Sequence, residues 1–175
     1  MIVKNKIDQQ GRVNIGIPSY GITIGPHEDN FDLNIEHCVK DIVYSLINLG
    51  YKTVGSCQGH HWVDNPFVII AFNGVEDANT FCLILKKYWF LRGWVITDKI
   101  IDDNGPMNVS VDNVNAWYNT NFKEVVCVQI ELRSELFLFI TNLNVIKKAF
   151  CSRIAKLLEE SLPQYSEITN KGKIC

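Results

Sequence analysis

The sequence has no long hydrophobic run, and this absence limits the classes of protein it can belong to. No apolar stretch approaches the roughly 18 residues that a membrane-spanning helix needs, and the run from Leu136 to Ile140 is far too short. The first residues turn polar at once, without the apolar segment of a secretion signal. We therefore expect no membrane association and a cytoplasmic location, in the producing cell or in a host.

The chain also lacks a surplus of positive charge. It carries 17 Lys and Arg against 19 Asp and Glu, which gives a formal net charge of −2. A protein that holds nucleic acid through its phosphates usually shows a basic surplus or stripe, and the sequence shows none. Basic pairs occur at Lys86-Lys87 and Lys147-Lys148, each on an expected helix, where a solvated face is the ordinary interpretation. The charge pattern therefore gives RNA binding no support.

A disulfide framework is not expected either, although the chain has six cysteines. An even count suggests disulfides mainly in small secreted proteins. Four of the six lie inside apolar, regularly patterned segments, where a thiol acts as a small hydrophobe. We expect these four to be reduced core residues: Cys38, Cys82, Cys127 and Cys151. Cys175 is the last residue, and only Cys57 lies among polar groups in an expected turn.

No Gly-rich loop for a dinucleotide or phosphate follows any expected strand, and there is no internal repeat or linker. The expected order is strands, a helix, two strands, a helix, three strands and a helix. With 175 residues of which 47% are apolar, this order predicts an α+β fold. We expect a single domain over residues 1–175, with a mixed β-sheet packed by about three helices and a loose tail at 164–175.

The three helices are predicted from apolar residues at helical spacing. The first has its buried stripe over residues 35–49, Asp32 or Asn34 as its cap, and Gly50 as its end. The second covers about residues 76–92 and places Trp89 on its apolar stripe. The third carries the apolar residues between 145 and 158.

Strands are predicted from apolar alternation and from turn residues. Their expected ranges are two short strands within 12–24, then 51–54, 67–72, 94–101, 107–111 and 124–133. The strand at 67–72 is apolar throughout, so both of its faces should be covered. In the strand at 124–133, Cys127, Gln129 and Glu131 fall on one face. Apart from the strand at 107–111, residues 102–123 are expected to form a long loop.

The segment most typical of a functional site is the expected turn Gly55-Ser56-Cys57-Gln58-Gly59-His60-His61. Glycine permits positive φ and lets a ligand approach the main chain closely. The turn supplies a hydroxyl, a thiol and imidazoles within a few residues, and connections at strand ends often carry sites. The plainer alternative is that Gly55 and Gly59 only shape a tight connection.

Three kinds of chemistry fit this turn. Cys57 can be a nucleophile with His60 as its base, because a neighbouring imidazolium lowers the pKa of a thiol. A zinc site can be drawn from Cys57 and His60 or His61, with His27 or Asp64. Structural zinc needs four ligands and a single Cys-x-x-His half-site is weak evidence, so a metal is not expected. The turn can also bind a ligand without a covalent step.

The turn and its surroundings resemble the TYW3-like family of wybutosine-synthesis methyltransferases over about residues 35–98. Family members carry an aromatic-x-Thr strand and a Ser-Cys-Ser-Gly-Arg turn after a comparable helix; the matching positions are Tyr51, Thr53, Ser56, Cys57 and Gly59. His60 replaces the family's Arg, Gln58 its second Ser, and the later family motifs have no counterpart. The resemblance implies S-adenosylmethionine-dependent transfer to a modified RNA base, for which alignment of donor and acceptor is the main requirement.

The resemblance and the residue types together suggest roles for the site residues. Cys57 and His60 would be the catalytic pair, with His60 as acid and base. The cofactor would be cradled by Gly55, Ser56, Gln58 and Gly59. The substrate, a nucleotide or other small molecule, would contact His61, Trp62, Trp117 and Arg12, because an indole can stack on a base and an arginine can clamp a phosphate.

Two other classes of function stay open at the level of sequence. One is a non-catalytic module that sequesters a small ligand or a partner protein. The other is a thiol- or metal-dependent hydrolase.

Overall fold

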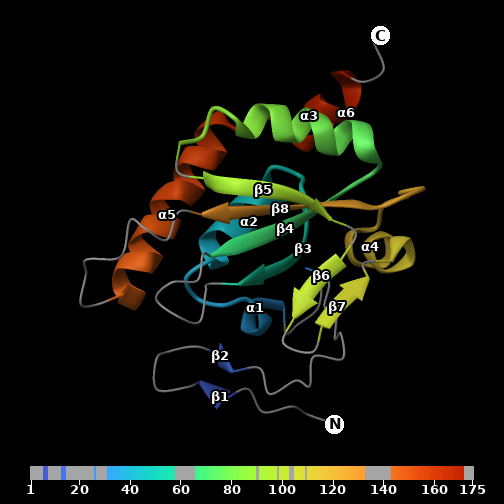
Figure 1. Cartoon of the computed structure of the whole chain (residues 1–175). Helices are drawn as coiled ribbons and strands as arrows, with labels where there is room; N and C mark the ends of the chain where they lie inside the picture. Colours follow the sequence, from blue (N-terminus) through green and yellow to red (C-terminus); the bar gives the residue numbers. More distant parts are fainter. Residues whose placement is uncertain are drawn as a thin grey trace.

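The computed structural model describes residues 6–7, 13–14, 26, 31–57, 66–89, 91–97, 99–102, 105–108, 110–132 and 143–171. Its main sheet has four strands in the order β3-β4-β8-β5 (Figure 1). Their bounds are β3 Lys52–Cys57, β4 Phe67–Phe72, β5 Leu91–Thr97 and β8 Val126–Leu132. Two further pairs are β1 (Lys6–Ile7) with β2 (Val13–Asn14), and β6 (Lys99–Asp102) with β7 (Gly105–Asn108).

The α+β class is confirmed. The three predicted helices are present as α2 (Lys40–Asn48), α3 (Val75–Leu85) and α5 (Leu143–Ser161). Shorter helices are α1 (Phe31–Asn34), α4 (Val111–Tyr118) and α6 (Tyr165–Lys171). None of the described helices is long and apolar enough to cross a membrane.

The prediction of a mixed sheet is wrong for the described strands, because all three pairings in the main sheet are antiparallel. The chain passes from β4 through α3 to β5, a connection typical of parallel neighbours. β8 lies between these two strands and runs antiparallel to both of them. β4 and β5 are therefore not paired with each other, and each pairs with β8 instead. This arrangement depends on β8, which begins more than 50 residues after the end of β4.

The larger core lies on the face of the sheet that carries Val68, Ile70 and Phe72. Residues of α2, α3, α5 and α6 pack against this first face, and Figure 1 shows α2 behind the sheet. The second face has a smaller cluster, in which Ile69 and Ala71 of β4 pack with residues of β8, of α4 and of the segment that follows α4. Both faces of β4 are therefore covered, as its uniformly apolar sequence predicts.

The predicted buried stripe of the first helix is confirmed, but the expected cap is not. All seven stripe residues are buried: Ile35, Cys38, Val39, Ile42, Val43, Leu46 and Leu49. The helix begins only at Lys40, and its N-cap, Val39, makes no side-chain cap bond. The carboxylate of Asp32 instead accepts hydrogen bonds from Lys40 and Tyr44. Gly50 ends the segment with φ +87°, as expected for a glycine after a helix.

The second helix is shorter than predicted, and part of the predicted long loop is a helix. α3 ends at Leu85, Trp89 is 67% exposed instead of buried, and Gly93 lies inside β5. The segment after residue 110 forms α4, whose first turn is capped by the Ser110 hydroxyl accepting from the Asn113 N–H. The sequence pattern missed α4 because only Val114 of this short helix is buried.

The prediction of a loose tail at 164–175 is wrong for residues 164–171. Tyr165 begins α6, its N–H donates to the carbonyl oxygen of Leu49, and its ring packs on Tyr51 and Phe72. Ile168 is also buried in the first core. Two apolar contacts in seven residues are too few to detect from a sequence pattern, yet they hold the helix on the sheet. Residues 172–175 lie outside the described residues.

Candidate functional site

The expected turn begins later than the sequence suggested, because β3 continues through Gly55, Ser56 and Cys57. Cys57 pairs with Phe67, and Ser56 pairs with Val68. The pairing of β3 with β4 shifts by one residue between Thr53 and Gly55, which marks a β-bulge. Bulges often lie beside functional sites, where they redirect side chains.

The pairing places Cys57 and Ser56 on opposite faces of the sheet. Directly paired residues of antiparallel strands share a face, so Cys57 and Gly55 lie on the second face with Phe67 and Ile69. Ser56 lies on the first face with Val68. Gly55 and Ser56 of the predicted cofactor cradle therefore do not share one surface, and Gly55 alone of these two lies on the same face as Cys57.

Two polar side chains of β8 complete this end of the second face. Glu131 pairs with Phe67 and Gln129 pairs with Ile69, so both lie on the same face as Cys57. The Nε2 atom of Gln129 donates a hydrogen bond to Oε1 of Glu131 over 3.1 Å. We call the set Gly55, Cys57, Phe67, Gln129 and Glu131 the Cys57 corner.

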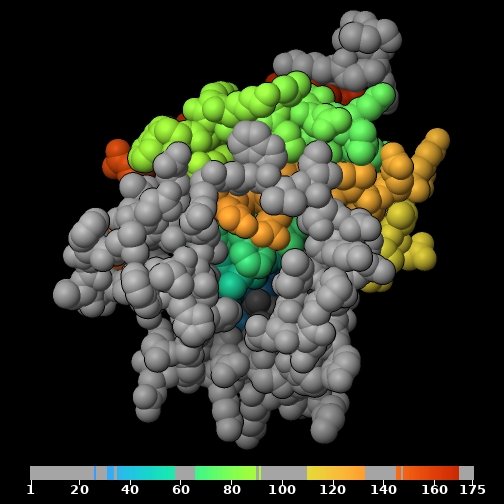
Figure 2. All heavy atoms as spheres, in the orientation of Figure 1, coloured from blue at the N-terminus to red at the C-terminus, as the bar shows by residue number. Residues whose placement is uncertain are grey.

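The exposure of the second face changes along the strands. Ile69, Ala71 and Cys127 are completely buried, whereas all five residues of the Cys57 corner are half-buried and in partial contact with solvent. Because α2 lies behind the sheet, Figures 1 and 2 view this second face. In Figure 2, teal and green atoms of β3 and β4 and orange atoms of β8 are visible on this face. The Cys57 corner is therefore more exposed than Ile69, Ala71 and Cys127 of the same face.

Sequence reasoning missed Gln129 and Glu131 as site residues, although a signal was present. The alternation of β8 already placed them on one face with Cys127. Polar side chains that alternate with apolar ones are ordinary where one face of an antiparallel sheet meets solvent, so this signal alone does not mark a site. The missing fact was that β8 lies in the interior of the sheet beside β4.

The other predicted site residues lie mostly outside the described residues, and so do two alternative zinc ligands. These positions are Arg12, His27, Gln58, Gly59, His60, His61, Trp62 and Asp64. Within the described part of the chain, no group of three or more His, Cys, Asp or Glu side chains is arranged to hold a metal ion.

Trp117 belongs to α4 and not to a loop, and its side chain is half-buried against the second cluster. Its neighbour Tyr118 donates a hydrogen bond to the carbonyl oxygen of Thr53. Burial raises the pKa of Tyr118 to about 12. Trp117 therefore belongs to the helix that flanks β3, and its role in binding a substrate stays a prediction.

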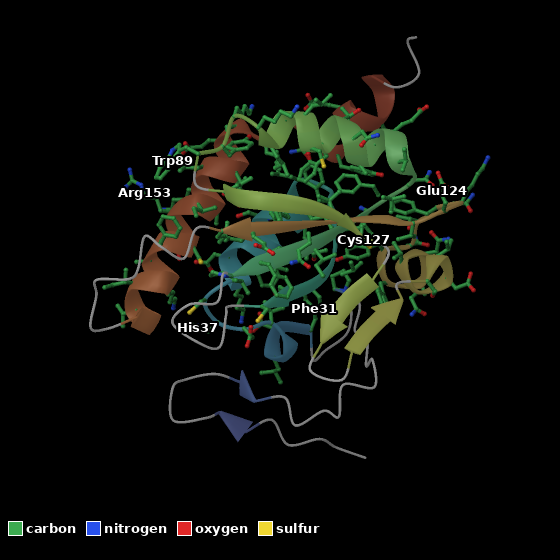
Figure 3. The ribbon with its side chains drawn as sticks, viewed as in Figure 1. Phe31, His37, Trp89, Glu124, Cys127 and Arg153 are labelled. Atoms are coloured by element: carbon green, nitrogen blue, oxygen red, sulfur yellow. The ribbon has the colours of Figure 1, made fainter. Side chains whose placement is uncertain are left out.

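The thiols follow the prediction. Cys38, Cys82, Cys127 and Cys151 are buried and reduced, and burial raises the pKa of the Cys82 thiol. Figure 3 shows Cys127 on the sheet. Cys57 is also reduced and is the one half-buried cysteine in the described part of the chain. It is therefore the described thiol best placed to meet a reagent or a ligand.

Lys52 is a second unusual polar group on β3. Its ammonium donates to the carbonyl oxygen of Gly50 over 2.8 Å and lies 5.4 Å and 6.0 Å from the ring centroids of Tyr118 and Tyr165. Burial lowers its pKa. These contacts hold the lysine between α4 and α6, away from the Cys57 end of the strand, so its role is to join elements.

Comparisons with known proteins gave no relative. No family model matches the chain, and neither the curated proteins nor the solved structures contain a significant match.

Proposed function

We propose that the Cys57 corner binds a small polar ligand and is the active site of a group-transfer enzyme. The short resemblance of residues 51–59 to the TYW3-like family makes S-adenosylmethionine the first donor to consider, and a nucleotide or RNA base the first acceptor. Within this proposal, Cys57 and His60 are the catalytic residues.

The observation that carries the proposal is the Gln129–Glu131 pair on an interior strand. Placing a carboxylate on a half-buried sheet face costs solvation free energy that an apolar side chain would not. The bond from Gln129 orients this carboxylate on the face that also carries Cys57. A fixed carboxylate beside an amide is suited to accept and donate hydrogen bonds to a polar ligand.

The donor set of the corner is compatible with S-adenosylmethionine. Glu131 would accept hydrogen bonds from an ammonium group or from ribose hydroxyls, and the ring of Phe67 offers an apolar contact. The cofactor would supply an activated methyl group. His60, three residues after Cys57, would take the proton that the acceptor loses.

Ligand-dependent stabilisation tests the proposal. The protein is heated with S-adenosylmethionine, S-adenosylhomocysteine or a panel of nucleosides and nucleotides, and the melting temperature is recorded. A ligand at about one hundred times its Kd stabilises the folded state by about 2.7 kcal/mol, which for a chain of this size is a rise of roughly 5–10 °C. We expect such a rise with at least one of these compounds.

Glu131→Gln should abolish most of the shift, because it removes the charge with little change in shape. The matched control is Glu160→Gln, which makes the same charge change at an exposed position of α5. If no compound raises the melting temperature, or if Glu131→Gln responds like the control, the proposed site is wrong. Methyl transfer itself is then measured with labelled donor and with His60→Ala and Cys57→Ala.

A further inference from the structure

The end of α3 and the outer side of α5 carry a basic surface around an exposed tryptophan. Its residues are Lys86, Lys87, Trp89, Arg153 and Lys156, and all five are exposed. We call this set the Trp89 surface. Figure 3 shows Trp89 and Arg153 at the same corner of the molecule, on two elements that are more than 60 positions apart in sequence.

Hydrogen bonds fix the end of α3 against α5. The Lys87 ammonium donates to the carbonyl oxygen of Ser161 over 3.2 Å, and the Ser161 hydroxyl lies 3.1 Å from that of Tyr88. Arg153 lies about two helical turns before Ser161, which is about 12 Å along α5. Lys156 lies somewhat more than one turn before Ser161, which is about 8 Å. The four cations therefore lie within a few nucleotide lengths of one another.

Two neighbouring carboxylates lie between α2 and α5, and a third is exposed close to Lys156 in sequence. Glu159 of α5 accepts a hydrogen bond from Ser45, and Asp41 of α2 accepts one from Ser152. Glu160 is the acid nearest in sequence to Lys156 on the exposed side. The local charge is therefore positive although the whole chain has a net charge of −2, and it is the local field that attracts a ligand of opposite charge.

We propose that the Trp89 surface binds single-stranded nucleic acid. Lysine and arginine side chains bind phosphates, and an exposed indole stacks on an unpaired base regardless of its identity. Trp89 is 67% exposed, so most of this residue is in contact with solvent. The bases of a duplex are already stacked and paired, which is why the surface fits a single strand. This inference is independent of the ligand proposed for the Cys57 corner.

An anionic membrane is the competing partner, since lipid headgroups also carry phosphates. A membrane-binding helix needs a continuous apolar face directed outward. The apolar residues of α3 face the first core, and the exceptions Val75 and Leu83 are isolated on its outer side. The observations therefore favour nucleic acid over lipid.

Fluorescence anisotropy with a labelled twelve-nucleotide oligo(U) RNA tests the proposal. With four phosphate contacts, the logarithm of the affinity should fall with the logarithm of the salt concentration at a slope of about −3. Lys86→Glu with Lys87→Glu should weaken binding at least tenfold and reduce the slope by about 1.4. Trp89→Ala should weaken binding roughly tenfold, and circular dichroism should stay unchanged because the side chain is exposed.

The control compares single changes at exposed lysines, and Lys123→Glu, which is not on α3 or α5, should lose much less affinity than Lys86→Glu. A DNA strand of the same length that binds equally well supports stacking and phosphate contact, and RNA-only binding supports an added 2′-hydroxyl contact. The proposal is overturned by absent binding at low salt, by equal losses in test and control variants, by equal affinity for duplex, or by binding only to phosphatidylserine vesicles.

Discussion

The hydroxyl of Tyr118 donates a hydrogen bond to the backbone carbonyl oxygen of Thr53, and the hydroxyl oxygens of the two residues lie 3.0 Å apart. Among the described strands, β3 lies at the edge of the main sheet, and an uncovered edge offers unpaired backbone groups to other chains. The contact places α4 over this edge, on the strand that ends at Cys57. The helix missed by the sequence pattern thus holds the strand that carries the candidate site.

Tyr118→Phe should therefore destabilise the protein. The substitution keeps the ring and removes a hydroxyl whose loss leaves the Thr53 carbonyl without its donor, at a cost of about 1–2 kcal/mol. Urea unfolding would show this as a lower midpoint with an unchanged slope. The matched control is Tyr44→Phe, whose hydroxyl bonds to Asp32 at an exposed site and should cost clearly less. Equal losses would mean that Tyr118 does not hold α4 on the edge.

Tyr165→Ala should be far more damaging than Tyr165→Phe. The ring contacts Tyr51, Phe72 and Phe122, and removing it should cost about 3 kcal/mol or more. The phenylalanine variant keeps the ring and loses two hydrogen bonds of the hydroxyl, one donated to Asp77 over 3.1 Å and one accepted from the Asn73 N–H. This loss should cost about 1 kcal/mol of stability.

Unfolding measurements on both Tyr165 variants, with exposed Ser166→Ala as the control, test whether α6 is part of the core. A mild effect of Tyr165→Ala would restore the interpretation of residues 164–171 as a loose tail.

Stability should fall between about pH 10 and pH 12. An exposed tyrosine titrates near pH 10, whereas burial raises the pKa of Tyr118 to about 12 and also raises those of Tyr51 and Tyr165. The unfolded chain therefore loses these protons first, and the stabilisation present below pH 10 disappears as the pH rises toward the folded-state value. Each such group contributes up to about 1.4 kcal/mol per pH unit in this window.

Urea unfolding at pH 9, 10 and 11 tests this for the wild type and for Tyr118→Phe. The difference between the two proteins cancels the titration of the other groups. The decline should be less steep in the variant, and parallel curves would contradict the assignment of the raised pKa to Tyr118.

Among the described cysteines, Cys57 should react first with iodoacetamide at neutral pH. It is half-buried, while Cys38, Cys82, Cys127 and Cys151 are buried and must await local opening. Peptide mass spectrometry at increasing times gives the labelling rate of each thiol, and Cys57→Ser identifies its peptide. Labelling of Cys127 as fast as Cys57 would mean that the second face opens as a whole, and would remove the reason to single out the Cys57 corner.

The sequence predicted best where one periodic pattern coincides with one buried surface. The stripe of α2 and the strand Phe67–Phe72 were predicted correctly because each has enough apolar residues for its period to be clear. The sequence predicted worst where a few tertiary contacts determine whether a helix forms. α4 has one buried apolar residue, α6 depends on Tyr165 and Ile168, and neither gives a readable period.

For the candidate site, the sequence located one strand and missed the other. Gly55 and Cys57 were named from residue type, but their separation from Ser56 follows from strand pairing. Gln129 and Glu131 join them only because β8 is inserted beside β4, more than 50 residues away in sequence. Of the Trp89 surface, the sequence suggested only Lys86 and Lys87 as a solvated pair and placed Trp89 on a buried stripe. Arg153 joins them through the packing of α5.

Three features could be predicted from short sequence patterns alone: the α+β class, the buried thiols and the glycine that ends α2. Those features depend on near neighbours, whose spacing the chain fixes by covalent geometry. The tertiary structure decided which strands touch, which face each side chain occupies, and which distant residues share a surface. Such outcomes depend on the burial of apolar area between segments that are far apart in the chain. A local sequence pattern does not show which of these segments will pack together.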